Sequence, residues 1–522
     1  MKFPGYAQNR QVTVFRLVVV VLTIGLSFLN FQVPFAYDDV VQIVQNNNLH
    51  DFFDWGAILR EPFRQNRVIQ NLTLSFDWMV SGGQTWSFHL FNNLLHAACT
   101  LVLASLLPLI GIRDRLANVL ICLLFFIHPI QIESVTYIMG RIELLKTLST
   151  LVLLLLYLQK KNKWVIYAGL IISLLVKETC VLTPCLFLSA DYILGTTDLK
   201  QIDWKKHLFF FSHALWLIPL RFLLNFDIHG GVVGFELYPY SDYLWTNLHY
   251  MYFYLMMFFN PAEQSIFHEW TAHPPLIDVI VGMGIWIFSI VAVFKFRKAK
   301  PVVSFLALFF LFSVAPYFTV LQFINPFAEY RLYQSNIILC VAIVLGVYAI
   351  PINQMLKFFI LGSFAAFLLF FNVLYTLQWQ EPRGLWAYAL EKYPGSSMSG
   401  QNLAFYLTEE NRCEESQKIL ERVCPSARFQ KIKNNCAFLS VSNLIGLMKY
   451  KEALPYMEAL IRESLAVKNQ AFYENYLDLL KELGEDAKFS SAHSDIQKIF
   501  KIKGAHEKWG FTIKGYTKSY CR

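Results

Sequence analysis

The sequence is long, apolar and poor in charge. Of its 522 residues, 56% are hydrophobic, 16% are aromatic and only 16% are charged, and the mean hydropathy is +0.41. Residues 379–522 alone hold 21 of the 45 Lys and Arg and 17 of the 37 Asp and Glu. This composition excludes a soluble enzyme, a disordered protein and a single-pass receptor. It predicts an apolar transmembrane domain, 1–378, followed by a tail of ordinary globular composition, 379–522.

The apolar segments of the first domain predict an α-helical bundle of about eleven spans, since a crossing helix needs roughly 17–25 apolar residues. The first segment precedes acidic residues and no small-residue cleavage site follows it, so we interpret it as a permanent span rather than a signal peptide. Segment 245–262 is rich in Tyr and Met, and we expect a re-entrant or interfacial helix there. The predicted spans lie near 12–34, 88–110, 117–130, 142–158, 164–177, 179–196, 207–225, 275–294, 302–323, 334–352 and 356–377.

Basic residues predict the orientation of these spans. Loops on one side carry sixteen Lys and Arg, and loops on the other side carry eight. The richer side is expected to be cytoplasmic. This places the N-terminus in the cytoplasm, and it places both the first long loop, 35–87, and the tail outside. We expect the inner membrane of a bacterium rather than the endoplasmic reticulum.

Cysteines support the same orientation. Five of the nine lie in or beside predicted spans, where a free thiol is usually a small apolar filler. The other four lie in the tail, and an even number confined to one segment is typical of disulfides in an oxidising compartment. Three pairings are possible. The candidates are Cys413, Cys424, Cys436 and Cys521.

Ionisable side chains at membrane depth are costly, so those that persist in an apolar chain are candidates for function. Asp38 and Asp39 directly follow the first predicted span. Adjacent carboxylates repel each other and can raise one pKa or hold a divalent cation such as Mg²⁺ or Mn²⁺. The alternative is an acidic pair at a helix N-terminus, stabilised by the helix dipole.

Two further groups lie at the ends of later spans. His89, Asn92 and His96 share one face of the second span, which favours a polar cavity over satisfied core residues. The third and fourth spans are joined by a segment broken by Pro and Gly, which leaves acids and a guanidinium in a short connection. The alternative there is a structural salt bridge between Glu133 and Arg141. The candidates in this connection are His128, Glu133, Arg141 and Glu143.

A fourth group combines acids and bases on the same predicted outer side. Arginine can bind a phosphate through two hydrogen bonds, so several such residues beside a lipid interface suit a lipid-linked phosphate. Interfacial anchoring explains each residue singly but explains the whole set poorly. The members are Lys177, Glu178, Arg221, Glu329 and Arg331.

Several common functions have no motif in this chain. A Walker loop, a GxGxxG turn after a strand and a zinc-spaced Cys/His set are all missing from the sequence. No basic run interleaved with aromatic residues indicates nucleic acid. We therefore expect no nucleotide cofactor and no nucleic-acid partner.

The order of these motifs resembles a known family. YDD after the first span, FHLxNxLLH in the second, HPIxxExVxxxxGRxE, KE at 177–178 and an AE…LY stretch near 328–333 occur together with a helical tail. The combination is similar to the transmembrane and tetratricopeptide-repeat-containing O-mannosyltransferases and their bacterial relatives. These belong to the GT-C superfamily of glycosyltransferases, which use polyprenyl-phosphate sugars. The resemblance covers nearly the whole chain.

The resemblance implies an integral membrane enzyme that transfers a sugar from a polyprenyl-phosphate carrier to a hydroxyl group at the outer face, with inversion. The acceptor would be Ser or Thr of a secreted protein, or a glycan. Asp38 matches the expected general base, and Asp39 would shape the site or help to bind metal, with Glu133 as a further catalytic candidate. The departing phosphate would be stabilised by cationic or imidazole donors. The candidates for this role are Arg141, Lys177, Arg331 and His96.

One motif departs from the family pattern. Members commonly have Glu-Arg, then Leu-Tyr and Pro-Ser, whereas this chain reads Glu329-Tyr330-Arg331-Leu332-Tyr333-Gln334-Ser335. The arginine is displaced by one position and the proline is missing from the motif. This difference bears on the role of Arg331 and on the donor lipid.

The tail, 379–522, is predicted to be a helical domain. Residues 379–522 show a rough periodicity of about 35–40 residues that is typical of tetratricopeptide-like helical hairpins. Such a domain would hold an acceptor protein or cap the membrane domain.

A flippase of lipid-linked sugars would also need buried charges, but transporters tend to show repeated halves. A non-enzymatic membrane scaffold that binds partners through the tail would not need Asp38, Asp39 or Glu133.

Overall fold

A computed structural model describes residues 10–59, 67–196, 198–223, 239–269, 273–318, 327–428, 430–464 and 470–492. In these ranges the chain forms helices joined by turns and loops, and no β-strand. It divides into two compact units, Met1–Glu381 and Pro382–Arg522. The division lies close to the change in composition at residue 379.

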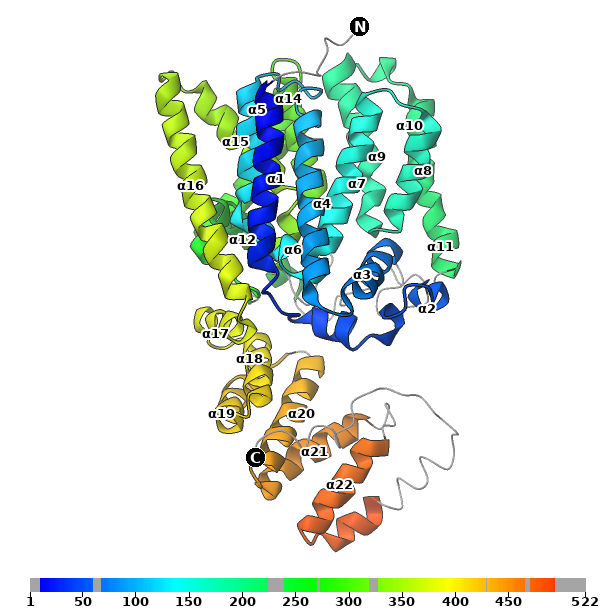
Figure 1. The fold of residues 1–522 in the computed structure, drawn as a ribbon, viewed down its shortest axis with the longest axis vertical. Coiled ribbons are helices and arrows are strands. Elements are labelled where there is room, and N and C mark those ends of the chain that lie inside the picture. The colour runs from blue at the N-terminus through cyan, green and yellow to red at the C-terminus, as the bar shows by residue number, and fades with distance from the viewer. Residues whose placement is uncertain are drawn as a thin grey trace. The chain divides into compact units, whose positions relative to one another are not determined.

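The first unit is a bundle of long helices that run alongside one another (Figure 1). The sequence dictates this because each segment is too apolar to face water and satisfies its backbone hydrogen bonds internally. Helix α4 is central, since it packs against α1, α5 and α7. The long helices are α1 (Arg10–Asn30), α4 (Thr85–Leu106), α5 (Arg115–Ile127), α7 (Arg141–Leu158), α8 (Lys163–Leu174), α12 (Tyr240–Phe259), α13 (Leu276–Lys295), α14 (Pro301–Val314), α15 (Asn336–Ala349) and α16 (Gln354–Trp379).

Among the described residues, α4, α13 and α16 are long and apolar enough to cross a membrane. Helix α5 and the segment Pro129–Val135, which meet at an angle of 52°, would together make a fourth span. The chain is therefore a membrane protein. Each predicted apolar segment contains a helix or a run of short helices, but about eleven crossings remain a prediction.

Two predicted spans are interrupted. Segment 179–196 begins as a 3₁₀ turn, continues as α9 (Thr183–Ser189) and ends as a π-helix, Ala190–Thr196. Segment 207–225 consists of α10 (Trp204–Phe211), a 3₁₀ turn and α11 (Leu217–Leu223). By contrast, α12 is unbroken over its 20 residues, where a re-entrant or interfacial helix is expected.

Side chains fix where several helices begin. Asp114 accepts a hydrogen bond from the backbone N–H of Ala117 at 2.7 Å, and Asn353 accepts one from Leu356 at 2.8 Å. Both satisfy a backbone donor that the first turn of a helix leaves open. Helices α5 and α16 therefore start directly after Asp114 and Asn353.

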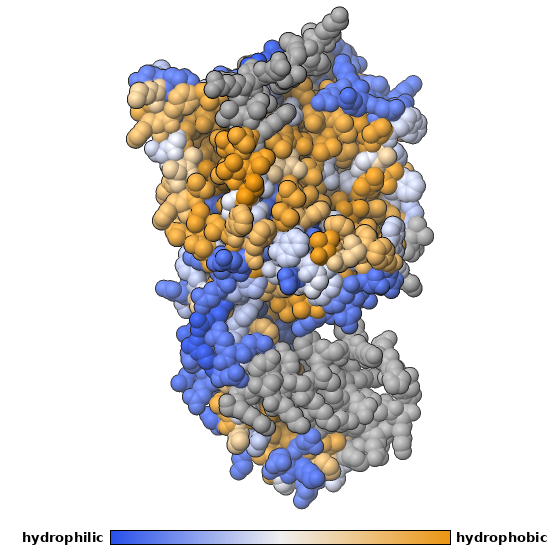
Figure 2. All heavy atoms as spheres, viewed as in Figure 1, coloured by the Kyte–Doolittle hydropathy of each residue, from blue (hydrophilic) through white to orange (hydrophobic). Residues whose placement is uncertain are grey.

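The surface of the first unit carries an apolar belt. Figure 2 shows hydrophobic residues across the middle of the bundle, with hydrophilic residues toward the two ends of its helices. On α13, Phe288 is 66% exposed and Phe294 is 71% exposed. Exposed apolar surface of this extent is expected where lipid replaces water.

Helices α12 and α13 approach each other closely at a glycine. A Cβ atom at Gly282 would collide with the backbone carbonyl of Leu248, whereas a Cβ atom at Gly284 would meet nothing within 4 Å. Small residues at such crossings let two helix backbones approach. Gly282 is therefore needed for the packing of α12 on α13.

Connecting segments of the first unit place the polar residues. They include α2 (Trp55–Leu59) and α3 (Val68–Ser81) in the first loop, and α6 (Ile132–Val135) between α5 and α7. Two 3₁₀ turns, Ile138–Gly140 and Glu329–Leu332, precede α7 and α15. The first loop, α6 and the second of these turns hold Asp38, Asp39, Glu133, Glu329 and Arg331.

The second unit consists of successive packed helices. Helix α18 packs on α17 and α19, and α20 packs on α21. Cys424 and Cys436 form a disulfide, and Cys413 is also disulfide-bonded, whereas Cys521 lies outside the described residues. The helices are α17 (Pro382–Lys392), α18 (Ser397–Glu409), α19 (Cys413–Val423), α20 (Gln430–Gly446), α21 (Tyr450–Ser464) and α22 (Gln470–Glu482). This arrangement agrees with helical hairpins, although tetratricopeptide character remains a prediction.

Candidate functional site

The acidic pair that follows α1 takes two different environments. Asp38 is half-buried, whereas Asp39 is 1% exposed. Asp39 accepts hydrogen bonds from the backbone N–H of Ala36 at 3.2 Å and of Met139 at 3.0 Å. Burial raises the pKa of Asp39 to about 8, although these two donors act to lower it. Asp39 thus ties the loop after α1 to the turn before α7.

Tyr37, the residue before Asp38, has an unusual backbone conformation. Its φ of 55° lies in the left-handed region, which bulky residues rarely adopt. The hydrogen bonds of Asp39 hold the turn in that conformation. The Tyr37 phenol interacts electrostatically with Asp38, Glu133 and Arg331, and burial together with Asp38 raises its pKa well above the usual value. The first loop therefore brings Tyr37, the neighbour of Asp38 in the chain, close to Glu133 and Arg331 of two later segments.

Glu133 and Glu329 hold the turn before α15. Glu133 accepts the backbone N–H of Tyr330 at 2.8 Å. Glu329 is fully buried and accepts hydrogen bonds from Ser265 N–H at 2.7 Å and from Gln264 Nε2 at 2.9 Å. Its Oε1 also lies 2.8 Å from His268 Nε2. These contacts fix the backbone on either side of Tyr330 and Arg331.

Two buried lysines share one carboxylate beneath this turn. Lys146 Nζ lies 2.7 Å from Glu143 Oε2, and Lys177 Nζ pairs with Glu143 Oε1. Tyr317 accepts hydrogen bonds from Lys177 at 2.8 Å and from Lys146 at 3.3 Å, and it donates to Glu143 at 3.1 Å. Two ammonium groups and one carboxylate leave an excess of one positive charge in a buried cluster.

Arg331 adds a further cation beside the lysines. Its guanidinium lies 5.7 Å from the ring centre of Tyr317 and 5.7 Å from that of Tyr330. It is partly exposed, and it is close enough to Glu133 to interact electrostatically. Lys146, Lys177 and Arg331 therefore surround a single tyrosine, Tyr317.

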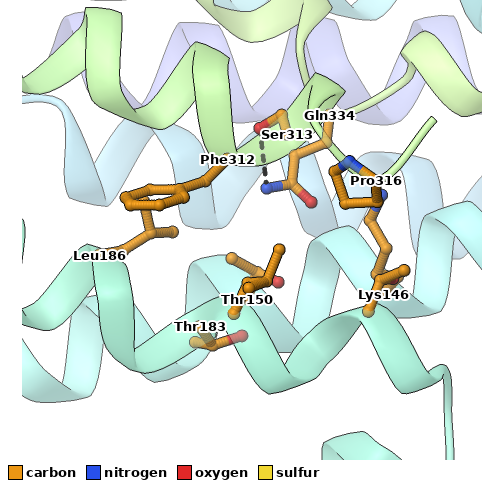
Figure 3. Close-up of a pocket in the computed structure, with 10 residues that line it drawn as sticks. Lys146, Thr150, Thr183, Leu186, Phe312, Ser313, Pro316 and Gln334 are labelled. Carbon is orange, nitrogen blue, oxygen red and sulfur yellow. Dashed lines mark hydrogen bonds between the residues drawn. The ribbon is translucent and has the colours of Figure 1, made fainter. Parts of the chain in front are cut away.

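A small cavity of about 20 Å³ lies next to Lys146. It has room for about one water molecule. Figure 3 shows Thr150, Thr183 and Gln334 around it, with Leu186 and Phe312 on its apolar side. Gln334 donates a hydrogen bond to Ser313 at 3.1 Å. The cavity therefore adds hydroxyl and amide groups to one side of the lysine cluster.

Arg141 is fully buried, and its guanidinium contacts other protein groups. Its Nη2 lies 2.5 Å from Asp77 Oδ2 and donates to the backbone carbonyl of Phe88 at 2.9 Å. Its Nε donates to Asn92 Oδ1 at 2.6 Å. The predicted alternative, a salt bridge from Arg141 to Glu133, is wrong, because Asp77 on α3 is the partner. Arg141 therefore ties the first loop to α4 and α7, and nothing in this geometry places it at a phosphate.

The predicted histidines are packed in the bundle. His96 is buried with Nδ1 2.7 Å from the Tyr333 hydroxyl and Nε2 2.9 Å from the Phe126 carbonyl, so both ring nitrogens are occupied. His89 Nε2 contacts the Val33 carbonyl at 2.9 Å. His128 caps the turn after α5 by accepting the N–H of Ile130 at 3.2 Å. His96 and His128 are thus packed as core residues with both ring nitrogens in contact, whereas Nδ1 of His89 is buried without a hydrogen-bond partner.

Glu178 interacts electrostatically with Lys177 and Glu143, so it lies close to the lysine cluster. Glu178 lies 3.8 Å from Arg67 and directly follows Lys177 in the chain. The side chain of Arg221 lies outside the described residues.

The described residues give little support for a metal site at the acidic pair. In this part of the chain, no group of three or more His, Cys, Asp or Glu side chains is placed to hold a metal ion. Both Asp39 oxygens already accept backbone N–H groups. A divalent cation held by Asp38 and Asp39 together remains a prediction.

Several residues that contact the predicted ones were not themselves predicted from the sequence. Lys146 follows Glu143 by three positions and so shares its helix face, and this spacing is the one signal that indicates their pairing. Tyr317, Asp77 and His268 carried no signal, because an aromatic, acidic or imidazole side chain far away in the chain has no spacing relation to its partner.

Comparison with known proteins gives a partial match. No family model matches the chain, and no solved structure matches it significantly. Protein O-mannosyl-transferase TMTC3 of Homo sapiens is 31% identical over 141 residues, which are 24% of this chain and 15% of that protein. TMTC2 of Homo sapiens is 32% identical over 154 residues, 27% of this chain and 18% of that protein. Tmtc2 of Drosophila melanogaster is 29% identical over 202 residues, 33% of this chain and 21% of that protein.

The aligned stretch is thus less than a quarter of each of these relatives, so the chain spans only a small part of their length. The resemblance expected from the motifs is confirmed: over these stretches the chain is similar to the protein O-mannosyl-transferases TMTC1 to TMTC4.

Proposed function

We propose that this membrane protein is a glycosyltransferase that moves a sugar from a polyprenyl-phosphate carrier to a hydroxyl group of a protein at the extracytoplasmic face. Mannose is the proposed sugar, because the similar proteins are named O-mannosyl-transferases. One observation carries the proposal. A half-buried carboxylate, Asp38, and the guanidinium of Arg331 both interact electrostatically with the phenol of Tyr37, and Arg331 in turn adjoins a buried cluster with excess positive charge.

Asp38 is the general base in this proposal. A serine or threonine hydroxyl is a weak nucleophile, so a carboxylate within hydrogen-bond reach accelerates its attack by accepting the proton. The acceptor oxygen forms a bond to C1 of the sugar, and the proton moves to Asp38. The bond from C1 to the phosphate oxygen breaks, and its electron pair stays on the carrier phosphate. C1 is inverted as a result.

The lysine cluster balances the charge of the carrier. A polyprenyl-phosphate sugar is a phosphodiester with one negative charge, which matches the excess positive charge of Lys146, Lys177 and Glu143. The released polyprenyl phosphate is a monoester that gains a second negative charge. Arg331 is placed to meet this added charge. Fixed donors at the position where charge develops are effective because they need no reorganisation during the reaction.

Three further acidic residues position the proposed reacting groups. Asp39 is a positioning residue, since its two backbone hydrogen bonds hold the Tyr37 turn that presents Asp38. Glu133 and Glu329 position the turn that carries Arg331. No step of the proposal requires a metal ion.

Topology supports the outer face as the place of transfer. The distribution of Lys and Arg favours a cytoplasmic N-terminus. The Cys424–Cys436 disulfide is typical of an oxidising compartment, such as the space outside a bacterial inner membrane. The second unit would then meet secreted acceptor proteins, either as a docking domain or as a cap.

The proposal is tested with purified protein in lipid nanodiscs. Radiolabelled polyprenyl-phosphate mannose and a secreted-protein extract are supplied, and label in protein is measured. We expect Asp38→Asn to lower transfer by about 10²–10⁴-fold. Asp54→Asn is the matched control, because Asp54 is an exposed carboxylate in the same loop whose capping hydrogen bond Asn can also accept. Equal transfer by wild type and Asp38→Asn would contradict the proposal.

A further inference from the structure

Two partly exposed tyrosines adjoin the proposed base and one of the cations. Tyr37 directly precedes Asp38, and the ring of Tyr330 lies 5.7 Å from the Arg331 guanidinium. Tyr137 links them, with ring centres 6.2 Å from Tyr37 and 6.5 Å from Tyr330. The two tyrosines therefore adjoin the proposed reacting groups, since Tyr37 precedes Asp38 in the chain and Tyr330 precedes Arg331.

A buried aromatic layer supports these two rings. Tyr137 is 4% exposed and stacks on Trp379, which is 1% exposed, at 5.7 Å. Tyr317 is 5% exposed and lies under Arg331. Rings at the surface that rest on a packed second layer are held in one position, and a held position lowers the cost of ordering them around a ligand.

The backbones of both tyrosines are fixed by side chains. Tyr330 gives its N–H to Glu133 at 2.8 Å, and its carbonyl accepts the Ser134 hydroxyl at 3.2 Å. The backbone of Tyr37 has a left-handed conformation, and the Asp39 side chain accepts the N–H of Ala36, the residue before Tyr37. Several hydrogen bonds therefore hold the backbone on which these two partly exposed rings are placed.

From this arrangement we infer that Tyr330 and Tyr37 form the subsite for the donor sugar. The inference rests on the proposed function, because in-line displacement requires the sugar to lie between the base and the phosphate. A pyranose has one face of C–H groups that packs on an aromatic ring, and hydroxyl groups at its edge that pair with phenols. Tyr330 supplies the ring face, and both phenols supply polar partners.

Arg331 links the sugar and phosphate subsites. Its guanidinium carries only donors, so in its hydrogen bond with Tyr330 the phenolic oxygen accepts and the phenolic proton points to another partner. A sugar hydroxyl on Tyr330 would thus be connected through Arg331 to the phosphate. Tyr330 determines sugar affinity in this arrangement, whereas Lys177 determines carrier affinity.

The test compares two lipids that differ only by the sugar. Equilibrium binding to nanodisc-embedded protein is measured for polyprenyl-phosphate mannose and for the same polyprenyl phosphate without mannose. We expect Tyr330→Ala to weaken binding of the mannosylated lipid by about tenfold, the amount one aromatic contact typically supplies. Binding of the bare lipid should stay within about twofold. Lys177→Met should weaken binding of both lipids.

Further variants keep the test decisive. Tyr330→Phe retains the ring and should lose only part of the mannose-dependent affinity. Tyr348→Ala removes a partly exposed tyrosine elsewhere in the first unit and should change neither affinity. Thermal melting in the same nanodiscs shows whether each variant is folded. Tyr330→Ala that remains folded and binds both lipids like wild type would overturn the inference, as would an equal loss for both lipids.

Failure of the inference and failure of the proposed function are distinguishable. Asp38→Asn should bind both lipids like wild type while its transfer of sugar falls by about 10²–10⁴-fold. If transfer depends on Asp38 but mannose binding is independent of Tyr330, the sugar subsite is wrong and the function stands. If wild type does not bind the mannosylated lipid, both are refuted.

Discussion

Breaking the buried pair of Arg141 and Asp77 is expected to destabilise the first unit without selectively weakening donor binding. Both side chains are buried, with 0% and 3% exposure, and their closest atoms are 2.5 Å apart. Removing one partner of a buried ion pair leaves the other charged and unsolvated, which costs about 3–5 kcal/mol. Arg141→Met also strands the hydrogen-bonding groups of Asn92 and Phe88. We therefore expect the upper end of this range for Arg141→Met.

The double variant separates a structural role from a ligand role. Asp77→Leu combined with Arg141→Met removes both charges and should recover much of the loss, since apolar replacement of a whole buried pair is often neutral. We expect a coupling energy of about 2–3 kcal/mol from the cycle. The free energy of unfolding is measured by SDS titration in mixed micelles, with tryptophan fluorescence as the signal. Arg113→Met, an exposed arginine, should change it by less than about 0.5 kcal/mol.

Lipid binding provides the decisive second measurement. Arg141→Met protein that is still folded should bind polyprenyl phosphate like wild type, because Arg141 is occupied by protein groups. A stable Arg141→Met variant that has lost phosphate binding, combined with Asp77→Leu that binds normally, would refute this reasoning. Arg141 would then be a phosphate ligand, as its place in the motif first suggests.

Three other expectations concern different parts of the chain. Gly282→Ala should lower the melting temperature by separating α12 from α13 at Leu248, whereas Gly284→Ala should not, and equal effects would contradict the close approach. Cys424→Ser should destabilise the second unit by about 2–4 kcal/mol in denaturant titrations under oxidising conditions, and the difference from wild type should vanish in reductant. The pKa of Asp39 is raised to about 8, so its contribution to stability is complete below about pH 4 and is lost as pH rises toward 8, by up to about 1.4 kcal/mol per pH unit. Asp39→Asn should flatten this part of the pH profile of unfolding, and an unchanged profile would contradict the assignment.

The helices could be predicted from sequence because their cause is local. Apolar length alone forces a helix in a membrane, and each predicted segment does contain helix. The breaks inside segments 179–196 and 207–225 could not be predicted, since π-helix and 3₁₀ turns there depend on how neighbouring helices pack. The continuity of α12 is likewise set by its long contact with α13.

The members of the site could be predicted better than their partners. Low charge density made Asp38, Glu133, Arg141, Lys177 and Arg331 conspicuous. Their partners follow from tertiary structure, which brings residues distant in the chain into contact.

Lys177 shows this limit, because it pairs with Glu143, 34 positions away, although Glu178 is its neighbour in the chain. In the same way Arg141 pairs with Asp77 rather than with Glu133. These two ion pairs could therefore not be predicted from proximity in the sequence.

Charge balance separates structural charges from the proposed site. Arg141 is matched by Asp77, and Asp39 is held by backbone N–H groups. Arg141 thus has its counter-ion within the fold, and the raised pKa of Asp39 keeps that carboxyl largely protonated at neutral pH. Lys146 and Lys177 share a single carboxylate, and burial makes an uncompensated cation expensive. An anion bound there would lower that cost, so the place where internal compensation fails is where a negatively charged substrate gains most from binding.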